Sequence, residues 1–183
     1  MKPLSKSHTD SLQMSATPSA MPTGRRQQLL LIALTGYIAF VFIQSLFYKF
    51  SNSPETQYIF GILDVWSGTL GWPGLFSPHG IFSQYVVGCA ELLASTLLLA
   101  GLLLKKPLLH TAGAALGLAV ISGAIFFHLF TPLGVQVRNA DGSLDGGELF
   151  ALACGVWISA VLILVLRRHT VLTLLSHLRA SRP

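Results

Sequence analysis

The fold of this chain is decided by the segment IFSQYVVGCAELLASTLLLAGLLL at positions 81–104. It is almost wholly apolar and carries a single charged side chain, Glu91. Because a helix rises about 1.5 Å per residue, about twenty apolar residues cross the roughly 30 Å of hydrocarbon in a bilayer. The segment exceeds that length, and it therefore predicts a helix that spans a membrane.

Three further apolar runs accompany this segment. The four spans are expected at about 28–48, 81–104, 108–130 and 149–166, and none is interrupted by Lys or Arg. Hydrophobic residues make up 52% of the chain and charged residues 10%, against roughly a quarter charged in globular proteins. Because a short chain cannot hide so much apolar surface in one core, a soluble enzyme is excluded. We predict an all-α membrane protein, a four-helix transmembrane bundle in the lipid bilayer.

The basic residues predict the orientation of this bundle. Four spans place both termini and the turn between the second and third spans on one side, and ten of the twelve Lys and Arg residues fall there. Basic flanks are retained in the cytoplasm, so both termini are expected to be cytoplasmic. This topology also accounts for the net charge of +5, from which we infer no nucleic-acid partner. The ten residues are Lys2, Lys6, Arg25, Arg26, Lys105, Lys106, Arg167, Arg168, Arg179 and Arg182.

The segments outside the spans are polar or rich in turn residues. Residues 1–24 carry no apolar periodicity, which predicts a disordered cytoplasmic leader before the membrane domain at 25–168, and 169–183 are expected to form a cytoplasmic tail. In the first outer loop, an acidic residue after Pro54 predicts a short interfacial helix at 55–66. We expect this helix to anchor the chain at the head groups, or to act as a lid over a site. Residues 141–148 are expected to form a turn.

The second span carries one polar and small stripe. Gln84, Gly88, Glu91 and Ser95 lie at i, i+4, i+7 and i+11, so this stripe is expected to face protein. An ionisable group inside a membrane costs at least about 2.5 kcal/mol, and Glu91 therefore requires an explanation. It is either a buried packing anchor bound to a neighbouring helix, or a group that handles a proton or contacts a ligand. We favour the functional hypothesis.

The third span adds two histidines and a pair of glycines. Gly113 and Gly117 permit close helix contact and are expected to pack within the chain, as is Gly88 of the second span. His110, at the inner rim, is expected to meet lipid head groups. His128, about one turn inside the outer boundary, is expected either to bond a neighbouring helix or to bind a ligand.

Residues of the first span complete a candidate site. Tyr37, Gln44 and Tyr48 lie on one stripe, which ends at Lys49 on the outer rim. Because the first three spans all carry polar groups at a similar depth, we predict an outward-facing polar pocket that handles a proton or binds a ligand. The members of this pocket are Glu91, His128, Lys49, Gln44 and Tyr85.

A metal site is not predicted. The two histidines of the third span lie at different depths, and Cys89 and Cys154 are isolated and expected to be buried. We therefore expect no metal, no covalently bound cofactor and no redox centre carried by this chain itself.

The order of these features resembles the DoxX-like family over about residues 25–167. The chain departs from the family pattern in its longer outer loop and its polar leader. The motifs that carry the resemblance are Arg25-Arg26 before a span with Gly36, Phe47-Tyr48-Lys49-Phe50, Leu70-Gly71-Trp72-Pro73-Gly74, Gly88-Cys89-Ala90-Glu91-Leu92-Leu93, Leu97-Leu98-Leu99-Ala100-Gly101-Leu102 and Ala124-Ile125-Phe126-Phe127-His128.

The resemblance implies a four-helix bundle of the bacterial inner membrane, with relatives linked to quinol oxidase and thiosulfate:quinone oxidoreductase complexes. It implies functional positions at Gly88, Glu91, Lys49 and His128. The leading hypothesis is a membrane subunit or accessory protein of a quinone-linked redox system, which binds a quinone or handles a proton and is not catalytic alone. Its partners would be redox-complex subunits or further copies of the chain. The alternatives are a small proton-coupled transporter-like protein and a structural membrane assembly factor.

Overall fold

The computed structural model describes residues 23–172 of the chain. Within this range it has five long helices: α1 (Thr23–Phe50), α2 (Pro54–Thr69), α3 (Gln84–Leu103), α4 (Pro107–Phe130) and α5 (Glu148–Leu166), and residues 168–172 are also helical. Most of the predicted leader and most of the predicted tail, at 1–22 and 173–183, lie outside the described residues. The basic residues Lys2, Lys6, Arg179 and Arg182 lie there as well.

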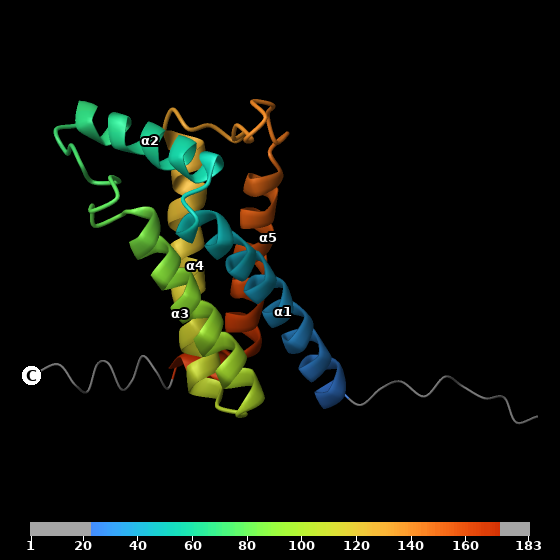
Figure 1. The fold of residues 1–183 in the computed structure, drawn as a ribbon. Helices are drawn as coiled ribbons and strands as arrows, with labels where there is room; N and C mark the ends of the chain where they lie inside the picture. The colour runs from blue at the N-terminus through green and yellow to red at the C-terminus, as the bar shows by residue number, and fades with distance from the viewer. Residues whose placement is uncertain (1–22, 173–183) are drawn as a thin grey trace, which may run out of the picture.

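The four predicted spans are confirmed as helices that are long and apolar enough to cross a membrane. The chain is therefore a multi-pass membrane protein with an all-α four-helix bundle. Around this bundle α1 packs against α3 and α5, and α4 packs against the same two helices (Figure 1). The second span begins three residues later than predicted, because Ser83 caps α3 by accepting a hydrogen bond from the amide of Val86.

The two ends of the bundle differ in charge and in structure. One end holds the start of α1, the turn between α3 and α4 and the end of α5 (Figure 1). We call it the basic end. The opposite end is covered by α2 and the loop at 131–147, and we call it the cap end. The basic residues described at the basic end are Arg25, Arg26, Lys105, Lys106, Arg167 and Arg168.

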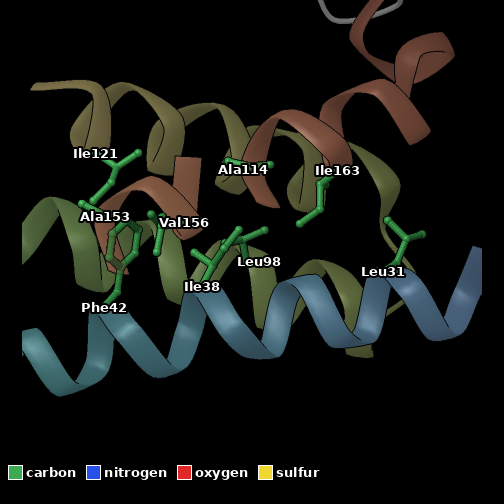
Figure 2. Close-up of a cluster of buried hydrophobic side chains, with 11 residues drawn as sticks. Leu31, Ile38, Phe42, Leu98, Ala114, Ile121, Ala153, Val156 and Ile163 are labelled. Carbon is green, nitrogen blue, oxygen red and sulfur yellow. The ribbon is translucent and has the colours of Figure 1, made fainter. Parts of the chain in front are cut away.

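The core lies along the axis of the bundle, where all four spans contribute apolar side chains (Figure 2). Ile38 of α1, Leu98 of α3, Ala114 of α4 and Val156 of α5 are all fully buried. Large apolar side chains such as Phe47, 73% exposed, cover the outside. Because lipid solvates apolar groups, this outer surface is the expected one for a membrane-spanning bundle.

Glycines set the spacing between α3 and α4. A Cβ added at Gly113 would lie 2.6 Å from the backbone nitrogen of Leu98, and one added at Gly101 would overlap the backbone of His110. A Cβ at Gly117 would lie 3.3 Å from the ring of Phe42. The two helices can therefore approach backbone to backbone, as small residues allow between membrane helices.

The predicted interfacial helix is present as α2, which lies across the cap end (Figure 1). Its N-cap Ser53 accepts a hydrogen bond from Thr56, and Pro54 occupies the first turn. The apolar face of α2 packs against the protein in a second cluster of buried side chains around Leu63, Phe76 and Val137. This packing fixes α2 on the cap end, and its roles as an anchor at the head groups or as a lid over a site stay predictions.

The loop at 131–147 is held by the carboxylate of Asp145. It accepts hydrogen bonds from the amides of Val137, Gly147 and Leu149, at 2.8, 3.0 and 3.1 Å. Burial works against the charge of this group, but the three amides outweigh it and hold the pKa of Asp145 below its usual range. The loop is joined to α2 by Glu55, whose Oε1 accepts from the amide of Ala140 at 2.9 Å.

Candidate functional site

The centre of the candidate site is an ion pair between α1 and α3. Nζ of Lys49 lies 3.0 Å from Oε2 of Glu91 and donates to its Oε1 at 3.1 Å. The side chain of Glu91 is 7% exposed and that of Lys49 is 14% exposed. Seven residues separate Glu91 from Gln84 at the start of α3, which corresponds to about 10 Å along the helix. The pair is thus enclosed by protein inside the span, below the cap end.

Local sequence explains why α1 comes so close to α3 at this point. Gly88 lies almost one turn before Glu91, and a Cβ added there would lie 3.4 Å from the ring of Phe50. The missing side chain leaves room for Phe50 and Leu46 at the end of α1. Lys49 is carried on that same end, so this close approach brings its ammonium to the carboxylate.

A serine lies one turn from each partner of the ion pair in the sequence of its helix. Nζ of Lys49 also donates to Oγ of Ser45, one turn earlier on α1. Ser95 lies one turn after Glu91 on α3, and its buried Oγ has no hydrogen-bond partner within residues 23–172. Oε2 of Glu91, although close to the ammonium, likewise lacks a well-directed hydrogen bond from any described residue. Because buried polar atoms are normally paired, these two oxygens are open to a further partner.

Gln84 fastens the end of α1 to the start of α3. Its Nε2 donates to the backbone carbonyl of Lys49 and to Oδ1 of Asn52, both at 2.9 Å. Asn52 has a φ of 53°, in the left-handed region that Asn adopts more readily than most residues. These bonds position the backbone that carries the Lys49 ammonium. The sequence places Gln84 on the polar stripe, but Ser45 and Asn52 have no distinguishing pattern and were not predicted.

Gln44 does not join this site. It is exposed on the outside of α1, since the face of α1 that turns inward runs through Ile38, Phe42 and Lys49. The prediction that Gln44 is a member of the pocket is therefore wrong. Tyr37 instead packs toward α5, where its hydroxyl donates to a backbone carbonyl.

Tyr85 and His128 make their contacts elsewhere. Tyr85 is 38% exposed and stacks on Phe50, with ring centroids 6.3 Å apart. His128 is 8% exposed and its Nδ1 lies 2.6 Å from the carbonyl oxygen of Gly134, so Nδ1 carries the hydrogen and donates. The His128 ring also meets Phe150 at 5.7 Å between centroids. Of the five predicted members, the structure thus brings only Lys49 and Glu91 into direct contact.

His110 is buried in the bundle and does not meet the head groups as expected. It is fully buried, and its Nε2 shares a hydrogen bond of 2.8 Å with the hydroxyl of Thr35 on α1. The expectation was wrong because Gly101 of α3 has no side chain. The first turn of α4 can therefore pack directly against the backbone of α3, which buries His110. The hydropathy of the span does not show this packing.

An apolar groove opens at the cap end. It has a volume of about 350 Å³ and is lined by aromatic and aliphatic side chains from α2, the segment after it and the end of α4. Trp66, Phe76 and Phe127 form its wall, and Phe82 lies two residues before Gln84. Its lining suits an apolar chain.

The His, Cys, Asp and Glu side chains of the described residues do not gather into a metal site. Within residues 23–172, no group of three or more His, Cys, Asp or Glu side chains could hold a metal ion. Cys89 and Cys154 are free, and Cys89 is exposed on the outside of α3, so its expected burial was wrong.

A scan against protein-family models and searches of curated proteins and solved structures found no significant match. Membership of the DoxX-like family therefore stays a prediction from sequence motifs. The geometry allows two kinds of chemistry at the ion pair: the ammonium of Lys49 can donate to a carbonyl oxygen, and the carboxylate of Glu91 can take up and return a proton.

Proposed function

We propose that this chain is a DoxX-like protein of the bacterial inner membrane with both termini in the cytoplasm. The support for the orientation is the concentration of Lys and Arg at the basic end, because basic flanks of membrane spans are generally retained in the cytoplasm. The support for the family is that the quoted motifs contain both partners of the ion pair, Lys49 and Glu91, together with Gly88, which lets α1 approach α3.

In this proposal the chain is a membrane subunit or accessory protein of a quinone-linked redox system. The observation that carries it is the enclosed Lys49–Glu91 pair, in which one carboxylate oxygen lacks a well-directed bond within the described residues. Intramembrane charges are costly and mark proton and ligand sites more often than they serve stability.

The residues present fit a quinone head group. A quinone supplies carbonyl oxygens that accept hydrogen bonds, and its reduction consumes protons as well as electrons. Lys49 would donate to such an oxygen, and Glu91 would hold or pass the proton, with Ser45 keeping the ammonium in place. The electrons would come from a redox subunit that binds this chain. The apolar groove at the cap end, whose lining includes Phe82, would suit the apolar tail.

The experiment compares Glu91→Gln with Glu55→Gln in membranes that carry the complete redox complex. Gln keeps the size of Glu91 and much of its hydrogen bonding but does not titrate. We expect quinone reduction to fall by at least about tenfold for Glu91→Gln, as for the loss of a proton-transfer group, and to be unchanged for Glu55→Gln at the cap end. Unchanged activity of Glu91→Gln across the pH range would overturn the proposal.

A second variant separates function from a purely structural ion pair. The double exchange Lys49→Glu with Glu91→Lys keeps opposite charges in contact but reverses their positions. If the pair only holds α1 against α3, the exchanged protein should be both folded and active. The proposal expects it to fold, as measured by thermal unfolding, and to be inactive.

A further inference from the structure

A second group of buried polar atoms lies at the basic end, remote in sequence from the ion pair. Nδ1 of His110, Oγ1 of Thr111 and Nε of Arg167 are all shielded from solvent, and none has a hydrogen-bond partner in the part of the chain that the structure describes. His110 is 0% exposed and Thr111 is 2% exposed. Because unpaired buried polar groups are costly, three at one end indicate a missing partner.

Each of the three atoms can donate a hydrogen bond. Arg167 Nε is always a donor, and the hydroxyl of Thr111 can donate. The hydroxyl of Thr35 donates to Nε2 of His110 when the ring hydrogen is on Nδ1, and Nδ1 is then a donor as well. Arg167 is also close enough to His110 to act on it electrostatically. With the ring hydrogen of His110 on Nδ1, a ligand rich in acceptors satisfies all three atoms.

The charge of this end favours an anion. Besides Arg167, the exposed cations Lys105, Lys106 and Arg168 lie at the same end of the bundle. The N-terminus of α4, which begins at Pro107, receives no side-chain cap. Its positive dipole end therefore adds to the field of the cations.

We propose that the basic end binds a phosphate group, that of an anionic phospholipid head group in the adjacent leaflet. Arg167 is its charged ligand at the rim, and His110 and Thr111 are the interior donors, reached directly or through an ordered water. Basic sites between membrane helices suit such head groups, because the acyl chains of the lipid remain in the bilayer beside the site. This site does not depend on the quinone-linked function.

Two adjacent arginines allow a matched test. Arg167→Gln and Arg168→Gln remove the same charge one residue apart, but Arg168 is exposed while Nε of Arg167 is buried. The full-length protein is purified in neutral detergent, and its retention of phosphatidylglycerol and of phosphatidylcholine is measured by native mass spectrometry. Thermal unfolding of each variant checks the fold, and Thr111→Val tests one interior donor without a change of charge.

We expect the wild-type protein to retain phosphatidylglycerol over phosphatidylcholine. Loss of one cation near the surface should weaken retention about fivefold for Arg168→Gln, and loss of charge-assisted hydrogen bonds should weaken it about tenfold further for Arg167→Gln. Thr111→Val should weaken it severalfold with the fold intact. Equal effects of the two arginine variants would show general surface attraction and overturn the site. Displacement of the lipid by inorganic phosphate alone would assign the site to free phosphate and overturn the lipid assignment.

Discussion

The Lys49–Glu91 pair should respond asymmetrically to the loss of either partner. At 3.0 Å and an effective dielectric constant of about 20, the attraction of the two charges is about 5 kcal/mol before desolvation is subtracted. Lys49→Gln leaves the carboxylate of Glu91 enclosed without its cation, which should lower the free energy of unfolding by about 3–5 kcal/mol. Glu91→Gln should cost only about 1–2 kcal/mol, because the amide still accepts a hydrogen bond.

The asymmetry has a second cause in the position of the lysine. Lys49 is the penultimate residue of α1, and its long side chain can turn toward the membrane surface once Glu91 is neutral. The carboxylate of Glu91 cannot reach the membrane surface in this way, since Glu91 lies more than a turn inside α3. The double variant should therefore cost about as much as Glu91→Gln alone, so the coupling energy should equal the cost of Lys49→Gln, about 3–5 kcal/mol in magnitude.

The assay is equilibrium unfolding of the four proteins in bicelles of one lipid composition, with Lys105→Gln as a control for an exposed lysine. The control should change the free energy of unfolding by less than about 0.5 kcal/mol. Equal costs for the two single variants that add up in the double variant would refute the reasoning. In that case the two charges would be independent, and the ammonium would already be solvated at the membrane surface.

Three further predictions concern the cap, the helix packing and the topology. The lowered pKa of Asp145 means that its contribution to stability is complete above its unfolded pKa and is lost as pH falls through its folded pKa, so the protection of the amides at 131–147, measured against their intrinsic exchange rates, should fall below about pH 4, and Asp145→Asn should weaken this pH dependence. Gly101→Ala should lower the free energy of unfolding by about 1–3 kcal/mol because its Cβ meets the backbone of α4, whereas Gly36→Ala, with open space around it, should be neutral or slightly stabilising in the same unfolding assay. In a background without the native cysteines, Ser143→Cys should react with an impermeant thiol reagent added outside intact cells and Lys106→Cys should not; the reverse result would invert the topology.

The number and the approximate limits of the spans could be predicted from the sequence because they depend on local composition. Any run of about twenty apolar residues has to be a helix in hydrocarbon, whatever its neighbours are. The inward orientation of the stripe that holds Glu91 could also be predicted, since a charged residue in a span has to face protein. The helix at the cap end followed from its proline and acidic first turn.

The rotation of each helix and the contacts of its polar groups were decided only by tertiary structure. Lipid and protein interior are both apolar, so hydropathy does not distinguish the inward face of a span from its outward face. For this reason the sequence did not show that Gln44 faces outward. His110 is drawn into the core by Gly101, a glycine on another helix. His128 is bound by Gly134 in a loop that folds back over the bundle. Such contacts depend on how separate segments pack, and no single segment contains that information.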